Sequence, residues 1–224
     1  MDSMKPKEDH SLSEKAYQTI YKRILSGKLK PGDKITEVGI SKSMGISQAP
    51  VREALKRLAE DNLVVLVPRS GCFIASLTPE EIDEIYEIRK LLEGLAMKYA
   101  FTHFNMLKVK ELRNAILTTG RIKHNYAEYI KANLKLDAQF HNLIYQESRC
   151  PNLRKMLEKL RARMQVLRVR TADYVGEMAV SPEEHVEILN CILQGNQPKA
   201  VELLTRHIDN TKNIALSSAR QKKD

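Results

Sequence analysis

Residues 35–61 read ITEVGISKSMGISQAPVREALKRLAED, and this stretch decides how the first part of the chain folds. It contains two short helical patterns separated by Gly45, which is placed to end the first helix in a left-handed conformation. Thr36 is placed to cap the first helix and Ser47 the second. An apolar stripe is expected along the second helix: Val51, Ala54, Leu55, Leu58 and Ala59.

The second helix also carries a polar face, on which Gln48, Arg52 and Lys56 follow one another at four-residue spacing. A helix, a tight turn and a second helix with long polar side chains near its N-terminal end are typical of a DNA-reading helix-turn-helix. An ordinary helical hairpin with a solvated basic face fits this part of the pattern as well. The residues that follow decide between the two interpretations.

Two β-prone runs come next, Leu63–Val67 and Cys72–Ala75, joined by the turn Pro68-Arg69-Ser70-Gly71. A helix-turn-helix followed by such a hairpin is typical of a winged helix, with Arg69 at the tip of the wing. The sequence therefore predicts an N-terminal winged helix-turn-helix that binds DNA.

The segment APVREALKRLAEDNLV, followed by PRSGCFI and preceded by LSGKLKPGDKITE, resembles the GntR family of bacterial transcription regulators. The resemblance covers about residues 11–77 and implies a DNA-binding role. Gln48 and Val38 stand where such proteins often carry Arg. Gln suits a bidentate contact with adenine and Arg one with guanine, so the operator sequence stays open.

Six residues are predicted to contact DNA. Gln48 and Arg52 are expected to contact bases. Phosphate or groove contacts are expected from four others: Lys42, Ser47, Lys56 and Arg69.

Composition supports a polyanionic partner, because the formal net charge of the 224 residues is +9. The cysteines Cys72, Cys150 and Cys191 lie far apart and favour reduced thiols over a disulfide framework or a zinc ribbon. No apolar run approaches the roughly 20 residues that span a bilayer, and the N-terminus lacks the apolar segment of a signal peptide. We therefore expect a cytoplasmic protein without a membrane partner.

A domain boundary is predicted at residue 77, which divides the chain into a DNA-binding domain (1–77) and a second domain (78–224). Thr78 is placed as an N-cap with Pro79 in the first helical position. Every periodic segment beyond it is typical of a helix. The six helices are expected near 79–101, 105–121, 126–148, 152–176, 182–194 and 198–219. The predicted fold class is mainly α, a winged helix followed by an all-α bundle.

Several polar residues interrupt the apolar stripes of these helices. Arg89 lies on the stripe of the first, Asp137 and His141 lie four residues apart on the third, and His185 and His207 lie on the fifth and sixth. Each alone fits a polar residue at the edge of a stripe. Together, one Asp and three His form a suitable ligand set for a divalent first-row metal.

The segments LDAQFHNLIY, PEEHVEIL and LLTRHI, with EIYEIRKLLEGLA as opening helix, resemble the FCD-type C-terminal domain of the FadR subfamily. Six helices instead of seven bring the chain closer to the VanR-like branch. The resemblance implies a metal such as zinc or nickel, held by Asp137, His141, His185 and His207. Arg89 is predicted to hold the oxygens of a small organic acid effector bound at the metal.

The sequence thus predicts a metabolite-responsive regulator, a repressor by its resemblance, that binds palindromic operator DNA as a homodimer. A constitutive DNA binder whose helical domain only dimerises around a structural metal is the alternative. A metal-dependent hydrolytic enzyme is disfavoured, because no catalytic base accompanies the metal ligands and the DNA-binding module would be unexplained.

Overall fold

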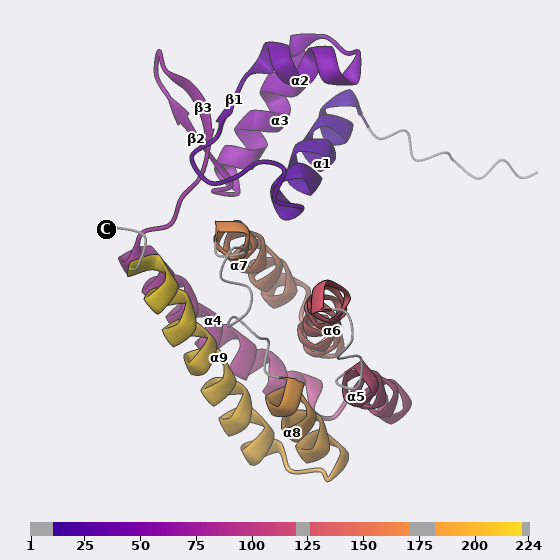
Figure 1. Ribbon diagram of the computed structural model, residues 1–224. Coiled ribbons are helices and arrows are strands. Elements are labelled where there is room, and N and C mark those ends of the chain that lie inside the picture. The colour runs from indigo at the N-terminus through magenta and orange to yellow at the C-terminus, as the bar shows by residue number, and fades with distance from the viewer. Residues whose placement is uncertain (1–10, 120–125, 171–181, 221–224) are drawn as a thin grey trace, which may run out of the picture. The chain divides into compact units, whose positions relative to one another are not determined.

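The computed structural model describes residues 11–119, 126–170 and 182–220 (Figure 1). The chain divides into two compact units, one of residues 1–76 with 162–170 and the other of residues 77–161 with 171–224. In the described part of the chain, a winged helix-turn-helix is followed by helices alone, which confirms the predicted fold class.

The described N-terminal residues 11–76 form three helices and a small sheet. Its elements are α1 (Leu12–Leu25), β1 (Lys34–Ile35), α2 (Glu37–Met44), α3 (Gln48–Glu60), β2 (Val64–Val67) and β3 (Gly71–Ile74). As predicted, Thr36 Oγ1 accepts a hydrogen bond from the Gly39 amide at 3.1 Å, and Gly45 ends α2 with a φ of 66°. Ser47 occupies the N-cap position of α3, but its side chain makes no capping hydrogen bond, so that part of the prediction was wrong.

Apolar side chains of the three helices and the sheet form one core. They include Ala16, Ile20, Ile24, Ile40, Val51, Leu55, Leu58, Leu63 and Ile74. The predicted hairpin is present, with Val64 opposite Ile74 and Val67 opposite Gly71. The sheet has a third strand, because β1 pairs antiparallel with β3 in the order β1-β3-β2. The sequence did not predict β1, since two residues are too short to show an alternating pattern.

The described residues after Ser76 contain six helices, which match the predicted ranges closely. They are α4 (Pro79–Ala100), α5 (Met106–Thr119), α6 (Tyr126–Glu147), α7 (Pro151–Arg170), α8 (Pro182–Leu193) and α9 (Gln197–Arg220). A full capping box at Thr78 and Glu81 starts α4. The predicted continuation of α7 to residue 176 falls outside the described residues.

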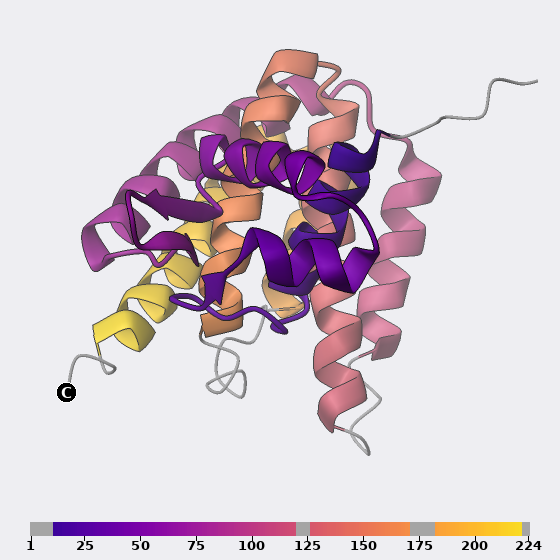
Figure 2. The same cartoon turned by 90° about the horizontal axis from the view of Figure 1, so that it is seen from above.

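Helices α4 and α9 lie side by side along much of their length (Figures 1 and 2). Helix α6 packs against α4, and α8 packs against both α9 and α5. Buried side chains from four of these helices, among them Ile85, Met97, Ile144, Ile188 and Leu204, make the core of this unit. Among the described residues, no helix combines the length and the apolar character needed to cross a bilayer.

Candidate DNA interface and metal centre

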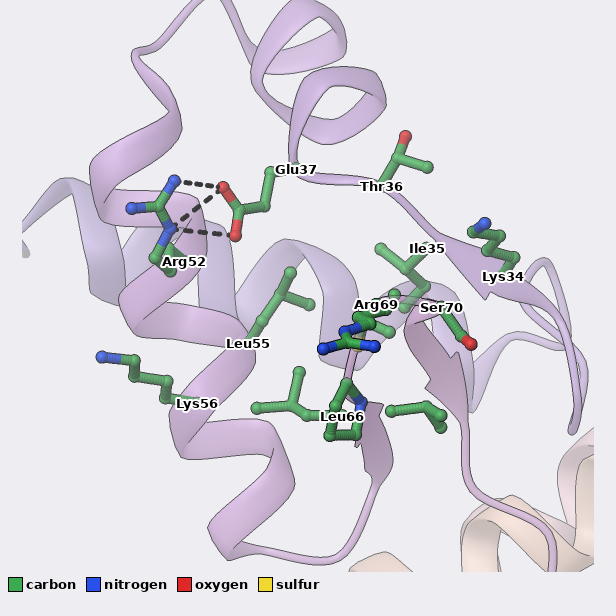
Figure 3. A pocket seen from close by; sticks show the side chains of 14 residues that line it. Lys34, Ile35, Thr36, Glu37, Arg52, Leu55, Lys56, Leu66, Arg69 and Ser70 are labelled. Carbon is green, nitrogen blue, oxygen red and sulfur yellow. Dashed lines mark hydrogen bonds and ion pairs between the residues drawn. The ribbon is translucent and has the colours of Figure 1, made fainter.

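The first candidate site is a groove between α3 and the wing (Figure 3). Its walls include basic side chains from three elements, Lys34, Arg52, Lys56 and Arg69, together with the apolar Leu66. All six residues predicted to contact DNA are exposed. Arg52, Lys56 and Arg69 line the groove, whereas Lys42, Ser47 and Gln48 lie outside it.

Arg52 is held by an acidic partner that the sequence analysis did not identify. Its Nε lies 3.0 and 3.1 Å from the two carboxylate oxygens of Glu37, and its Nη2 lies 2.8 Å from Glu37 Oε2 (Figure 3). These hydrogen bonds lower the pKa of the Glu37 carboxyl. The Arg52 side chain remains 59% exposed, so Glu37 orients the guanidinium without covering it.

The tip of the wing is a tight turn closed by a hydrogen bond from the Ser70 amide to the Val67 carbonyl oxygen. Arg69 adopts a φ of 62°, a conformation that costs a residue with a side chain about 1–2 kcal/mol. Gly71 has a φ of 116°, and a Cβ there would lie 3.1 Å from Lys34 Cε. Backbone geometry at this turn therefore presents the Arg69 side chain at the exposed tip.

The second candidate site is a buried polar cluster in the helical part. Asp137 and His141 on α6, His185 on α8 and His207 on α9 each offer a ligand atom, and these atoms lie within 4.8 Å of one another. None of the four side chains is more than 3% exposed. The structure thus brings together all four residues that the sequence singled out.

The candidate ligand atoms that approach one another in this cluster are the Nε2 atoms of the three imidazoles and a carboxylate oxygen of Asp137. His185 Nε2 lies 3.2 Å from His207 Nε2 and 3.9 Å from Asp137 Oδ1. His141 Nε2 lies 3.4 Å from the same oxygen. The ring of Phe140 stacks on His185 with centroids 4.1 Å apart, which restricts the orientation of that imidazole.

Two glutamates bind the far side of two of these imidazoles. Glu93 Oε2 lies 2.8 Å from His141 Nδ1, and Glu184 Oε2 lies 2.7 Å from His207 Nδ1. Hydrogen bonds of this kind fix the tautomer and leave the Nε2 lone pair facing the cluster. Sequence reasoning missed both glutamates. The available signals were the four-residue spacing from Arg89 to Glu93 and the position of Glu184 directly before His185.

Arg89 lies on the inner face of α4, as the interrupted apolar stripe predicted, and is 4% exposed. Its Nε donates to Glu93, and its Nη2 lies 2.9 Å from His141 Nε2. Its Nη1 is buried and has no hydrogen-bond partner among the described residues. A buried unpartnered donor is costly and marks a place where a ligand is expected.

The electrostatics of the cluster disfavour the protonated form of two of the imidazoles, those of His185 and His207. Burial, followed by the neighbouring His207, lowers the pKa of His185 well below its usual range. Burial also lowers the pKa of His207, although its bond to Glu184 opposes that shift. Burial disfavours the charged form of Glu93, but the charge of Arg89 and the hydrogen bonds from His141 and Arg89 outweigh burial and lower its pKa. Neutral imidazole is the form that binds metal ions.

Comparison with known proteins gives two family matches. Residues 12–74 match the model described as bacterial regulatory proteins, gntR family, and residues 84–210 match the FCD domain. The chain is 30% identical over 195 residues to the HTH-type transcriptional regulator YdhC of Bacillus subtilis (strain 168). The aligned region covers 86% of each of the two chains.

Two solved structures share the fold. A transcriptional regulator GntR from Rhodococcus sp. RHA1 has a TM-score of 0.79 at 20% identity and covers 92% of this chain and 98% of its own. The metal-free FCD domain of the transcriptional regulator TM0439 has a TM-score of 0.54 at 21% identity and covers 66% of this chain and 99% of its own.

Proposed function

Since the chain belongs to the GntR family of bacterial regulatory proteins and carries an FCD domain, we propose that it is a metal-dependent, metabolite-responsive repressor. Its family and its domains are those of a DNA-binding transcriptional regulator and not of an enzyme, as the sequence analysis predicted. In this proposal the cytoplasmic protein binds a palindromic operator as a homodimer. A small organic acid bound in the helical domain changes its affinity for that operator.

The DNA-reading part of the proposal assigns roles to the exposed polar residues of α3 and the wing. Gln48 and Arg52 contact bases, because their side chains project from the first two turns of the helix expected to enter the major groove. Lys42, Ser47, Lys56 and Arg69 contact phosphates or the groove edge. Their exposure and the basic lining of the groove in Figure 3 support this assignment.

The observation that carries the sensing part is the convergence of Asp137, His141, His185 and His207 in a buried cluster. Three imidazoles and one carboxylate suit zinc or nickel. These four residues would hold the ion, which supplies positive charge and open coordination positions for an anionic ligand. Arg89, with a buried Nη1 that lacks a partner among the described residues, would bind the carboxylate of that ligand.

An exposed apolar stripe on α4 supports the homodimer. Ile88, Leu91, Leu95 and Tyr99 lie three or four residues apart on one face, and they are 38, 74, 40 and 51% exposed. Contiguous apolar surface of this kind marks an interaction site, and a two-fold interface places the same patch on both subunits. A two-fold dimer also matches a palindromic operator.

The alternative is a constitutive DNA binder in which the metal is structural. The nearly complete burial of all four candidate ligands favours it, because structural metal sites are closed to solvent. Removal of the metal distinguishes the two. A sensor would stay folded and lose its response, whereas a structural site would unfold with its domain.

The experiment that tests the proposal begins with protein purified without a tag. Bound metal is identified by inductively coupled plasma mass spectrometry, and a bound organic acid by mass spectrometry of the denatured extract. We expect about one zinc or nickel ion per chain. The Asp137→Ala and His141→Ala variants should lose the ion, and retention of stoichiometric metal by both variants would exclude the proposed ligand set.

A further inference from the structure

Lys34 is an exposed basic residue beside the wing, and the predicted DNA contacts do not include it. It is the first residue of β1, the strand that the sequence did not predict, and it lies directly opposite Phe73 on β3. Lys34 also lines the groove between α3 and the wing (Figure 3). The pairing of β1 with β3 therefore brings a cation from an earlier part of the chain to the wing.

The Lys34 side chain lies over the turn of the wing. A Cβ added at Gly71 would lie 3.1 Å from Lys34 Cε and 3.8 Å from Lys34 Nζ. Because Gly71 has no side chain, the stem of Lys34 has room to pass close to the backbone there. Gly71 is two residues from Arg69, so the turn carries Arg69 on its own backbone and Lys34 from the neighbouring strand.

The ring of Phe73 provides a second contact for Lys34. Residues directly opposite each other on neighbouring strands have side chains on the same face of the sheet. Lys34 Nζ accordingly lies 5.9 Å from the centroid of the Phe73 ring, a distance at which a cation is attracted to an aromatic face. The ring and Gly71 together favour a position of the ammonium group near the turn.

We propose that Lys34 binds the phosphate backbone of DNA together with Arg69, so that the wing holds phosphate with cations from two separate elements. This inference rests on the proposed function. It adds to that function a further DNA-binding residue and the part of the DNA that this residue binds.

The position of Lys34 favours phosphate over a base. Helix α3 is the element expected to enter the major groove, and the wing lies beside it across the groove in Figure 3. A sugar–phosphate backbone borders the major groove on each side, so a surface beside the helix faces phosphates. The ammonium group of lysine is a compact charge that binds phosphate without the planar geometry needed to recognise a base.

The charge of the groove also favours phosphate as its occupant. Four basic residues and one acidic residue line it. The acidic residue, Glu37, binds Arg52 and offsets part of the charge of that side chain. The positive charge that remains is carried mainly by Lys34, Lys56 and Arg69, which suits a polyanion.

The test measures DNA affinity by fluorescence anisotropy in sodium chloride from about 50 to 200 mM, a range over which phosphate contacts change affinity strongly. One duplex is selected from a random library by the wild type and the other is a scrambled duplex. Each phosphate contact contributes about 0.9 to the slope of log affinity against log salt, which corresponds to about 8-fold in affinity between about 1 M and 0.1 M salt.

Lys34→Gln should therefore reduce the slope by about 0.9 and lower the affinity for both duplexes by the same factor, about 8-fold near 0.1 M salt. Lys34→Arg keeps the charge and should keep the slope. Lys15→Gln is the matched control, because Lys15 is an exposed lysine on α1 that does not line the groove. It removes the same charge and should leave the slope unchanged.

The outcomes separate this inference from the proposed function. A wild type without affinity for either duplex would overturn both. If the wild type binds DNA and Lys34→Gln keeps the wild-type slope, or loses no more of it than Lys15→Gln, only the role of Lys34 is overturned. A loss confined to the selected duplex would assign Lys34 to a base and contradict phosphate binding. Should circular dichroism show that Lys34→Gln does not fold, Lys34→Met keeps the apolar stem over Gly71 and removes the charge, with the same expected results.

Discussion

Glu37 restrains Arg52 before any DNA is present, because both carboxylate oxygens accept hydrogen bonds from one edge of the guanidinium. A side chain that is already oriented loses less conformational entropy on binding, so the proposed contact of Arg52 with a base should be stronger. The negative charge of Glu37 should also weaken nonspecific attraction to phosphates. We therefore expect Glu37 to influence sequence discrimination without itself contacting a base.

Substitution of Glu37 should change specificity more than affinity. In Glu37→Gln, binding to a duplex selected from a random library by the wild type should weaken, and binding to a scrambled duplex should strengthen. Arg52→Ala is the reference variant, and its free energy of binding to the selected duplex should weaken by about 1–3 kcal/mol. Fluorescence anisotropy measures the affinity for each duplex, and the ratio of the two affinities gives the specificity. Equal changes on the two duplexes would assign both residues to backbone contacts.

The buried histidines predict a pH dependence of stability. The pKa values of His185 and His207 are lower in the folded chain than the usual value near 6.5. Below about pH 6.5 the unfolded chain therefore binds more protons than the folded chain. The free energy of unfolding is therefore higher above this pH and falls on acidification. The loss is up to about 1.4 kcal/mol for each unit by which the pKa of a histidine differs between the folded and unfolded chain.

Thermal unfolding followed by circular dichroism between pH 7.5 and 5, with a chelator present, measures this loss. His185→Gln should show a shallower decline than the wild type. His103→Gln is the control, because His103 is only partly buried and lies outside the cluster. A wild-type decline that His185→Gln reproduces in full would contradict the prediction.

At the scale of single elements, two glycines with opposite roles allow a matched test. Gly45 ends α2 with a φ of 66°, so Gly45→Ala should destabilise the chain by about 1–2 kcal/mol. Gly94 lies within α4, where an added Cβ would lie 3.9 Å from Val201 Cγ1, an ordinary contact. Gly94→Ala should stabilise by about 0.5–1 kcal/mol.

Urea denaturation of the two variants measures the change in the free energy of unfolding, which should be negative for Gly45→Ala and positive for Gly94→Ala. Gly32, with a φ of 88° and open space around its Cβ position, provides a further left-handed site for comparison. A stabilised Gly45→Ala variant, or a destabilised Gly94→Ala variant, would show that packing around these helices differs from the structure.

The elements themselves could largely be predicted from the sequence, because caps and apolar periodicity are local signals. Thr78 and Pro79 predicted the start of α4, and the apolar stripe of α4 predicted that Arg89 lies on its inner face. The partners of buried groups could not be predicted in this way. The spacing of Glu93 from Arg89 indicates the inner face of α4, but only the packing of α4 against α6 brings it to His141. Likewise, Glu37 and Arg52 meet across two helices whose crossing no local pattern specifies.

At the scale of the whole molecule, the stripe on α4 predicts the oligomeric state. Leu91 is 74% exposed at its centre, so Leu91→Arg should convert the proposed dimer to a monomer by placing like charges against each other across a two-fold axis. Sedimentation equilibrium measures the mass, and affinity for a palindromic duplex should fall in parallel. Met156→Arg, which changes another exposed apolar residue on α7, should leave the mass unchanged. A dimeric Leu91→Arg variant would place the interface elsewhere.

The four side chains of the buried cluster come from three separate helices, spaced along the chain from residue 137 to residue 207. An ion shared among them would act as a cross-link between distant segments, much as a disulfide does, by limiting the freedom of the unfolded chain. Unlike a disulfide, it would withstand a reducing environment. Its strength would instead follow the supply of the ion, so scarcity of a trace element would shorten the lifetime of the protein against proteolysis.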